Sequence, residues 1–254
     1  MDANRIVEDF LHYFAVVPAE TEALRREAFR IRYQVYAQEL GWEDQARFPD
    51  GCEIDEFDAD AVICLLRHRP SARFAGCVRL VMRTENPTAP FPFELAMHHG
   101  GHPLDDSGLG DGWRAACGEI SRIAVVSQFR RRRNERDRPD TDVDNSDTAT
   151  PERRVFPHIA MGLYLGAAAM GLRRGLESVF AIMEPKLARR LRLYGIEFEA
   201  VGEPFEHRGT RVPYRLRRDR FLATISPAIR GLLDVIEADL DGTPRAHTPR
   251  GATS

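Results

Sequence analysis

The 254-residue chain has few cysteines, and none of them stand in a paired motif. Cys52, Cys64, Cys77 and Cys117 are dispersed and show no C-x-x-C spacing. This pattern indicates neither a disulfide framework nor a cysteine-based zinc site, and it predicts reduced thiols. Three of them (64, 77 and 117) lie on or beside predicted strands, where we expect inert core thiols.

Long apolar runs are also missing. No stretch approaches the roughly 20 apolar residues of a membrane span, and charged residues interrupt the first apolar ones, so we expect no secretory signal. A cytoplasmic location is the corresponding expectation. The formal net charge is -3, which argues against a generally basic nucleic-acid binder. His98, His99 and His102 lie close together, but no cysteine or second cluster completes a metal site, so we expect a solvated loop and no metal.

The hydrophobic pattern predicts an α/β protein. We find no internal repeat and no composition break, and we therefore expect one domain over residues 1–241. Residues 134–152 are polar and acidic, which predicts a disordered insertion, and 242–254 is a predicted disordered tail. Period-2 and apolar runs predict strands, and period-3.6 patterns predict helices. The strands are 13–17, 61–67, 75–82, 118–126, 178–183, 198–201 and 211–216. The helices are 20–39, 155–174, 185–195 and 227–239, with a further short helix around 93–97.

The stretch 118–126 is the one around which the rest of the sequence is organised. Its second half is apolar, as in a buried central strand, whereas its first half carries a carboxylate, a hydroxyl and a guanidinium. Strand alternation predicts Glu119 and Ser121 on one face and Ile120 and Arg122 on the other. Buried charges are costly unless they are paired. The available partners are upstream, and we predict one amine-handling site that includes Arg32, Asp55, Asp58 and Arg79.

Several motifs follow one another in a recognisable order. A predicted helix carries an arginine, an aromatic residue and then a Gly-Trp pair, which are Arg32, Tyr36, Gly41 and Trp42. A Glu-x-Asp-x-x-Asp run (Glu53, Asp55, Asp58), a hairpin arginine (Arg79) and a Glu-x-Ser-Arg strand (Glu119, Ser121, Arg122) come next. Over roughly residues 20–220, this order resembles the autoinducer-synthase (acyl-homoserine-lactone synthase) branch of the GNAT acyltransferases.

The chain also departs from short autoinducer synthases. Tyr36 stands where phenylalanine is usual, the chain is longer, and it has an arginine-rich insertion. In these features it is more similar to N-acyl amino acid synthases and to acyltransferases associated with the PEP-CTERM/exosortase system.

The resemblance implies a GNAT-like fold, with a mixed central sheet flanked by helices on both faces. It implies an N-acyltransferase that moves a long-chain fatty acyl group from an acyl carrier protein thioester to the amino group of an amino acid, with no bound cofactor. One alternative is an acyl-homoserine-lactone synthase with S-adenosylmethionine as acceptor. Another is a non-catalytic GNAT-like module that binds lipid or carrier protein.

Acyl transfer to an amine needs a base, a polarised carbonyl and a positioned thioester. We assign catalysis to Glu119, as the base, together with Ser121 and Arg122. In the GNAT fold a backbone N–H polarises the carbonyl, and here it would fall within 123–126. Arg79 and Arg122 either bind the acceptor's carboxylate or pair with Asp55 and Asp58. Trp42 and Phe57 would supply apolar wall, and the full substrate-binding set is Arg32, Tyr36, Trp42, Glu53, Asp55, Asp58, Arg79, Phe91 and Phe93.

The donor follows from another absence. GNAT enzymes that use coenzyme A have a glycine-rich turn after the central strand, whose N–H groups bind the pyrophosphate. Residues 127–133 contain no glycine but four arginines. They suit an acidic carrier protein that presents acyl-phosphopantetheine, and a coenzyme A donor is the less favoured alternative. The predicted docking residues are Arg130, Arg131, Arg132, Arg133, Arg153, Arg154, Lys186, Arg189 and Arg190.

Simpler explanations exist for each of these features. Without the resemblance, Glu119 and Arg122 would be interpreted as a structural ion pair more often than as a catalytic site, and the ordered motifs favour the functional interpretation. The arginines at 130–133 are compatible with a solvated run or a nucleic-acid patch, although acidic residues within 140–147 would partly cancel their field.

Overall fold

A computed structural model describes residues 3–129 and 157–242 of the chain. The predicted insertion at 134–152 lies outside the described residues, as do all but the first residue of the predicted tail. The docking arginines at 130–133, 153 and 154 also lie outside them.

A central sheet organises the described residues. Its strand order is β1-β2-β3-β4-β5-β8-β6, and β7 pairs with β8 alone. The pairing of β4 with β5 is parallel and the other described pairs are antiparallel, so the sheet is mixed, as predicted. The strands are β1 (Phe14–Pro18), β2 (Ala61–His68), β3 (Phe74–Met82), β4 (Cys117–Val125), β5 (Ser178–Met183), β6 (Glu199–Ala200), β7 (Phe205–Glu206) and β8 (Thr210–Arg217).

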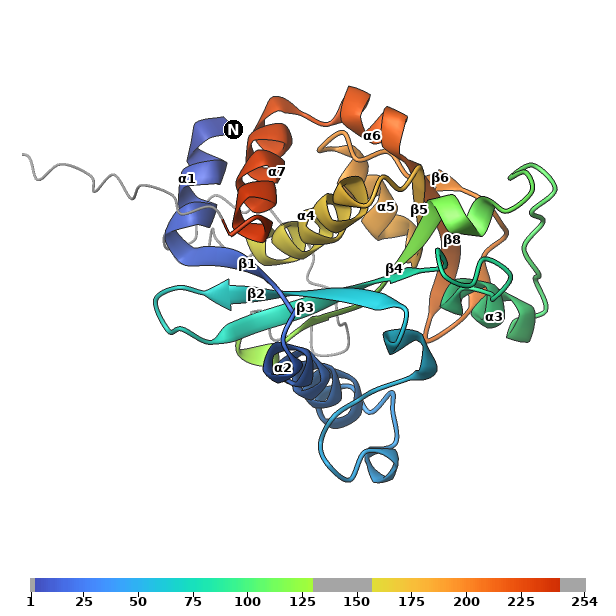
Figure 1. Cartoon of the computed structure of the whole chain (residues 1–254), viewed down its shortest axis with the longest axis horizontal. Helices are drawn as coiled ribbons and strands as arrows, with labels where there is room; N and C mark the ends of the chain where they lie inside the picture. The colour runs from blue at the N-terminus through green and yellow to red at the C-terminus, as the bar shows by residue number, and fades with distance from the viewer. Residues whose placement is uncertain (1–2, 130–156, 243–254) are drawn as a thin grey trace, which may run out of the picture.

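Helices cover both faces of the sheet (Figure 1). One face is covered by α2, and α1, α4 and α7 lie together on the other, which confirms the predicted fold class. The helices are α1 (Ala3–Tyr13), α2 (Glu22–Arg32), α3 (Pro92–His99), α4 (Pro157–Arg173), α5 (Pro185–Arg192), α6 (Arg218–Thr224) and α7 (Pro227–Leu240).

The small residues of α4 allow it to lie close to the sheet, as their pattern predicts. A Cβ added at Gly166 would lie only 2.7 Å from the sulfur of Cys64 on β2, and one at Gly162 would lie 2.6 Å from the ring of Phe10. Cys64 and the other three cysteines are all buried and free. The helix therefore packs through its glycines against thiol and aromatic core residues.

Two helices were not predicted, and one predicted helix is divided. The pattern gave no helix for α1 or α6, although Phe10 of α1 is fully buried. The helix predicted over 20–39 is α2, followed by a π-helical segment, Tyr33–Glu39, in which the Leu40 N–H donates to the Val35 carbonyl. This wider turn carries Tyr36 to the sheet.

Two irregularities of β4 shape the sheet next to it. In the pairing of β3 with β4, Cys77 lies opposite Ala124 and Arg79 opposite Ser121, so β4 has one extra residue between these pairs. This is a β-bulge, and Arg122 within it has a φ of 50°. Pairing of β4 with β5 also stops after Glu119 and Phe180. Beyond that point the two strands separate.

Candidate functional site

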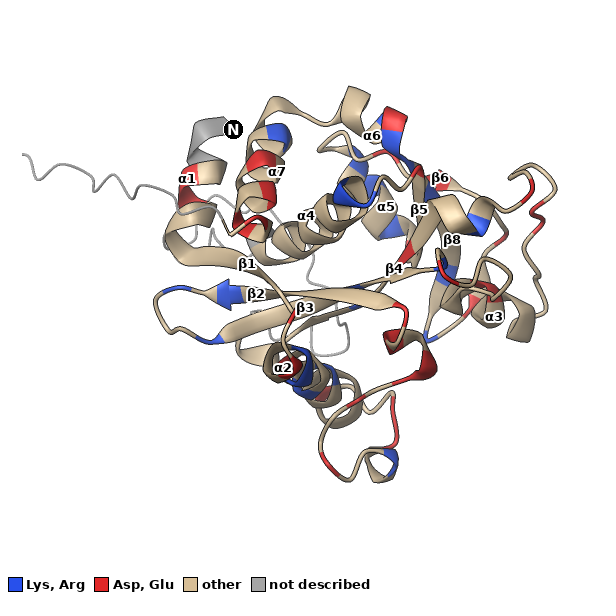
Figure 2. Cartoon of the chain, in the orientation of Figure 1, with Lys and Arg blue, Asp and Glu red and all other residues tan. Residues whose placement is uncertain are grey.

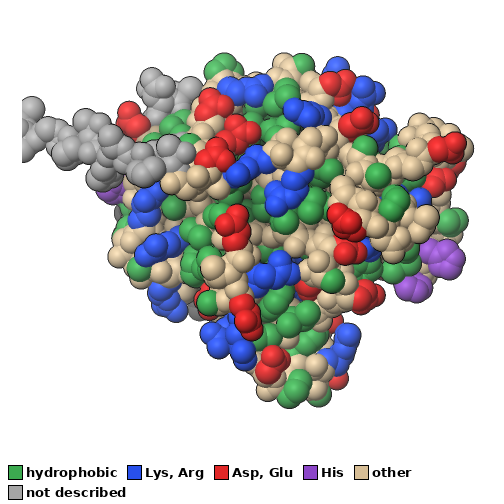
Figure 3. All heavy atoms as spheres, viewed as in Figure 1, with side chains coloured by type: hydrophobic (Ala, Val, Ile, Leu, Met, Phe, Trp, Pro, Cys, Tyr) green, Lys and Arg blue, Asp and Glu red, His purple; other side chains and the backbone are tan. Residues whose placement is uncertain are grey.

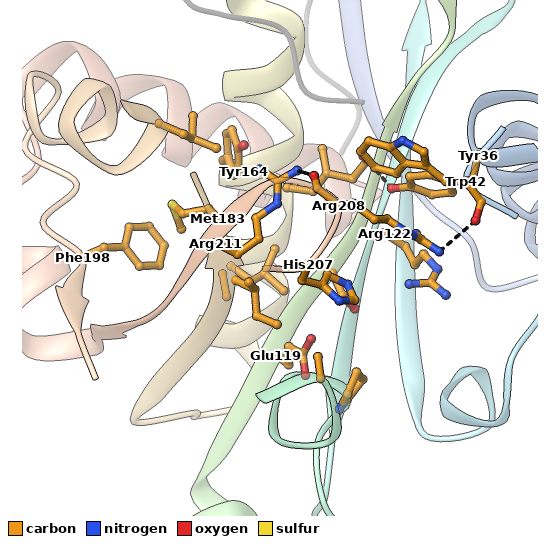
Figure 4. Close-up of a pocket in the computed structure, with 18 residues that line it drawn as sticks. Tyr36, Trp42, Glu119, Arg122, Tyr164, Met183, Phe198, His207, Arg208 and Arg211 are labelled. Carbon is orange, nitrogen blue, oxygen red and sulfur yellow. Dashed lines mark hydrogen bonds between the residues drawn. The ribbon is translucent and has the colours of Figure 1, made fainter. Parts of the chain in front are cut away.

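A pocket of about 240 Å³ lies where β4 and β5 separate (Figure 4). The backbone groups of β4 that would otherwise bond to β5 face this space, because the ladder ends at Glu119. The pocket is lined by Tyr36, Trp42, Pro92, Ala96, Glu119, Ile120, Ser121, Arg122, Ile123, Tyr164, Ala181, Ile182, Met183, Leu187, Phe198, His207, Arg208 and Arg211.

The pocket has an apolar end and a polar end. Figure 4 shows Phe198, Met183 and Tyr164 on one side of the pocket, and Tyr36, Trp42 and Arg122 on the other. Apolar side chains suit an acyl chain, whereas guanidinium, imidazole and carboxylate groups suit a polar acceptor. The two ends meet at the start of the gap between β4 and β5.

Glu119 is buried in the wall of this pocket. It is 3% exposed, and its Oε2 accepts a 2.8 Å hydrogen bond from the backbone N–H of Phe93. Burial raises the pKa of Glu119 to about 8. Within residues 3–129 and 157–242 it forms no ion pair. Glu119 is therefore a carboxyl group that can exchange a proton near neutral pH.

A network of paired charges lies beside Glu119. Arg32 donates to both carboxylate oxygens of Asp58, at 2.6 and 3.0 Å, and also to Glu53. Arg79 donates to Asp55 at 2.5 Å and to the Ser121 hydroxyl at 3.1 Å. These bonds join α2, the acidic segment 53–58, β3 and β4 into one unit. Figure 2 shows the acidic residues gathered between α2 and β2.

The paired carboxylates remain ionised. Burial acts to raise the pKa of Asp58, but the hydrogen bond and charge of Arg32, with Arg79, outweigh it and lower this pKa to about 2. Burial likewise opposes ionisation of Glu53, whereas Arg122 and Arg32 outweigh it and lower the pKa of Glu53. Asp58 and Glu53 are thus ionised at neutral pH.

Arg122 lies on the face opposite to the predicted one. It bonds to Glu53 at 3.1 Å and to Asp55 at 3.0 Å, and Asp55 also binds Arg79. The prediction assumed regular alternation, but the bulge between Ser121 and Ala124 interrupts it. Arg122 consequently joins Glu119 and Ser121 on the α2 side of the sheet.

The predicted substrate-binding set divides into three groups. Tyr36 and Trp42 line the pocket with the catalytic candidates. The charged members do not line it but form the buried network beside it: Arg32, Glu53, Asp55, Asp58 and Arg79.

Phe91 and Phe93 form the third group, and their expected contact with substrate is wrong. Their side chains are 0% and 1% exposed and belong to a core cluster with Trp113 and Phe180. Phe93 contributes to the site only through its backbone N–H. Phe57 is also absent from the lining and packs instead beneath Arg79 and Arg83.

The contacts of residues 123–126 reduce the candidates for the backbone N–H that would polarise the acyl carbonyl. The Val126 N–H donates to the Ala75 carbonyl, and Ala124 and Val125 pair with β3. Of the four residues only Ile123 lines the pocket. Its N–H is the remaining candidate for polarising an acyl carbonyl.

Comparison with known proteins agrees with this geometry. Residues 31–148 match the family model described as acetyltransferase (GNAT) domain. The chain has the GNAT fold. The resemblance to autoinducer synthases drawn from the motifs is confirmed at the level of the fold by solved structures.

Three of these structures are informative about the GNAT fold of this chain. TofI, in a ternary complex with an inhibitor and MTA, has a TM-score of 0.55 at 20% identity, and the match covers 85% of this chain and 99% of the TofI chain. BjaI, a CoA-dependent acyl-homoserine lactone synthase, has 0.51 at 22% and covers 83% and 86%. FeeM, an N-acyl amino acid synthase from uncultured soil microbes, has 0.50 at 14% and covers 85% and 96%.

Three basic or imidazole side chains of the pocket were not predicted from the sequence as site residues. His207 and Arg208 lie in the turn after β7, which has only two residues and gives no periodic signal, whereas Arg211 begins the predicted strand 211–216. Partial desolvation in the pocket, followed by the charges of Arg208, Arg211 and Arg122, lowers the pKa of His207, so its imidazole is neutral near pH 7. No local pattern would have placed them opposite Glu119.

Of the predicted docking residues, three lie in the described part of the chain. All three lie on α5, whose basic positions are blue in Figure 2; Lys186 and Arg189 are exposed and Arg190 is half-buried. On the face seen in Figure 3, basic and acidic side chains are interspersed. None of the described helices is long and apolar enough to cross a membrane. Within residues 3–129 and 157–242, no three His, Cys, Asp or Glu side chains are arranged to hold a metal ion.

Proposed function

We propose that this protein is an N-acyltransferase that moves a long-chain acyl group from a carrier-protein thioester to the amino group of an amino acid. The observation that carries the proposal is Glu119, a buried carboxyl without an ion-pair partner in the described chain, at the point where β4 and β5 separate. A GNAT fold with such a group at this place supports acyl transfer more strongly than a passive binding module.

In the proposed reaction the acceptor nitrogen attacks the thioester carbonyl carbon. Glu119 takes one proton from the nitrogen, directly or through a water, as the N–C bond forms. The C–S bond then breaks, and the sulfur leaves as a thiol after taking up a proton. The Ile123 N–H would stabilise the negative charge that develops on the carbonyl oxygen.

The charges of the pocket support an acceptor that carries a carboxylate. Arg122, Arg211 and the neutral His207 are among the lining side chains, whereas Glu119 is the only carboxylate among those of the described part. Hydrogen-bond donors therefore predominate around the acceptor. A free amino acid, which is an anion once its amine is deprotonated, suits this lining better than the sulfonium cation of S-adenosylmethionine.

Arg79 is not available for this carboxylate. It already donates to Ser121, Asp55 and Asp58, and it is 1% exposed. Arg122 and Arg211 are also ion-paired, Arg122 with Glu53 and Asp55 and Arg211 with Glu184 at 2.9 Å, but unlike Arg79 both line the pocket. We assign carboxylate binding to these two residues.

The exposed side of α5 supports a carrier-protein donor. Lys186, Arg189 and Leu193 follow one another at three- and four-residue steps, and Leu193 is 81% exposed. On the other side of the same helix, Leu187 lines the apolar end of the pocket. A basic stripe ending in a leucine fits an acidic helix that carries an apolar residue, and a pantetheine arm would have a short path to the pocket.

The test is a reaction of the full chain with acyl carrier protein thioesters or acyl-CoA, and with a mixture of amino acids or S-adenosylmethionine, followed by mass spectrometry. We expect N-acyl amino acids from the carrier-protein donor and loss of product with Glu119→Gln. Acyl-homoserine lactones would overturn the acceptor, and equal use of acyl-CoA would overturn the donor. Absence of any product with all four combinations would overturn the activity.

A further inference from the structure

The tip of the β7–β8 hairpin adopts an unfavourable backbone conformation. Arg208 has a φ of 55°, next to Gly209 at 97°, and a side chain with a Cβ disfavours this region. The tip residues His207, Arg208 and Gly209 are exposed, and β7 has only two residues of pairing with β8. Local strand pairing therefore provides little to hold this tip over the pocket.

The side chain of Arg208 fixes the hairpin tip by contacts with Trp42 and Glu43 on the other side of the pocket. Its Nη2 donates to the Trp42 carbonyl at 3.1 Å and to a Glu43 carboxylate oxygen at 2.6 Å. Its guanidinium carbon lies 5.3 Å from the centre of the Trp42 ring. The bond to the Trp42 carbonyl, drawn in Figure 4, joins residues 166 positions apart in the sequence. It joins the β7–β8 hairpin to the segment that follows α2.

The contacts continue from Trp42 to β4. The rings of Trp42 and Tyr36 stack, with centroids 6.0 Å apart and planes 18° apart. The guanidinium of Arg122 lies 5.7 Å from the centre of the Tyr36 ring. The Tyr36 hydroxyl donates to the Ile123 carbonyl at 2.8 Å. Two aromatic rings are thus placed between two guanidiniums, in an arrangement that we call the four-residue stack.

We propose that Arg208 is a positioning residue that holds Trp42 and, through Tyr36, fixes the bulge of β4 at which Arg122 and Ile123 stand. Arg208 would act on the reaction by keeping this wall in place and not by contact with the reacting atoms. The four-residue stack follows from contacts within the fold, whereas its effect on acyl transfer rests on the proposed function.

A planar guanidinium is the chemical requirement of this proposal. Lysine can donate to the Trp42 carbonyl and to Glu43, but it lacks the flat surface that stacks on an indole. Arg208→Lys should therefore restore part of what Arg208→Ala loses. Arg217 at the far end of β8 is a matched control, because its exposed guanidinium pairs only with nearby Asp219 in the described chain.

The experiment measures Trp42 directly. The chain has two tryptophans, and Trp113→Phe leaves Trp42 as the only one while keeping an aromatic ring beside Phe91. In this background, Arg208→Ala should shift Trp42 emission to the red and increase its quenching by acrylamide. Arg208→Lys should give a smaller change, and Arg217→Ala none. Acyl transfer should lose about tenfold in kcat/KM with Arg208→Ala, with the acceptor's KM affected more than kcat.

The outcomes separate the inference from the proposed function. Unchanged Trp42 emission and quenching in Arg208→Ala would overturn the inference whether or not the protein transfers acyl groups. Full recovery in Arg208→Lys would overturn the stacking requirement. Should Arg208→Ala or the Trp113→Phe background fail to fold, Arg208→Gln in the wild-type chain gives the same test, because it removes the guanidinium and Trp113 then adds only a constant signal. A Trp42 signal there equal to wild type would also overturn the proposal.

Discussion

Glu53 and Glu119 are buried to nearly the same degree, with 1% and 3% of their surfaces exposed, but their pKa values are shifted in opposite directions. Glu53 bonds to Arg32 and Arg122, and these charges lower its pKa. Glu119 receives one backbone N–H, and burial raises its pKa to about 8. Because both residues are buried, the presence or absence of a neighbouring arginine, and not the extent of burial, decides whether the carboxyl group is ionised.

This difference separates two regions of the site. The network around Glu53 and Asp58 keeps its charges fixed and ties α2 and the acidic segment to the sheet. The pocket wall at Glu119 has a group that can change its charge near neutral pH. Two carboxylates whose environments push their pKa values apart have separate roles. We assign support to the first region and proton transfer to the second.

Replacing the unpaired glutamate should have the largest effect. Glu119→Gln removes the base but keeps the shape and the acceptor oxygen for the Phe93 N–H. We expect a loss of about 10²–10⁴-fold in kcat/KM, with unfolding free energy at pH 8 equal to or above that of the wild type. Reaction rates followed by mass spectrometry give kcat/KM, and urea unfolding gives the unfolding free energy. Retained activity would show that another group accepts the proton.

Breaking the paired region should instead affect stability. Arg32→Met leaves Glu53 and Asp58 buried without their main cation, and breaking a buried pair costs about 3–5 kcal/mol. Urea unfolding measures this loss. Arg30→Met on the exposed side of α2 is the matched control and should change the unfolding free energy by less than about 0.5 kcal/mol. Equal effects of the two variants would contradict a structural role for the network.

The pH dependence should distinguish the two regions by sign. Between its ordinary pKa of 4.5 and about 8, Glu119 keeps its proton when folded and loses it when unfolded. Its contribution to stability therefore falls as pH rises through this window, and Glu119→Gln should gain on the wild type there. Asp58, with its pKa lowered from 3.8 to about 2, contributes stability above 3.8 that is lost as pH falls towards 2.

Unfolding curves from pH 2 to 9 test both signs, and the rate of acyl transfer should rise with pH towards about 8. A rate that levels off near pH 4.5 would contradict the raised pKa of Glu119.

The sequence predicted the site as far as local patterns reach. Strand alternation and the upstream charges placed Glu119, Ser121 and the network partners next to one another, because each lies on a regular element or a short motif, but they did not show that the network lies beside the pocket and not in its lining. Arg122 was placed on the wrong face since a bulge has no clear sequence signal. Phe91 and Phe93 were wrongly taken as substrate contacts since an aromatic residue at a loop–helix boundary suits a core equally well. Arg208 and Arg211 escaped notice since only tertiary packing brings their hairpin to the pocket.

Tyr36 joins the two regions, and its hydroxyl should give the smallest effect. It donates to the Ile123 carbonyl at the bulge of β4, while its ring contacts Arg122 of the network and Trp42 of the pocket wall. Tyr36→Phe keeps the stack but leaves that carbonyl without its donor. We expect a loss of about 0.5–1.5 kcal/mol in unfolding free energy and a smaller loss in kcat than for Glu119→Gln. Tyr33→Phe on the same π-helical segment is the control. If Tyr36→Phe lost as much unfolding free energy as Arg32→Met, the bulge of β4 would belong to the supporting network around Glu53 and not to the pocket wall. The supporting region would then include residues 121–124 of β4, and the proton-transfer region would be limited to Glu119.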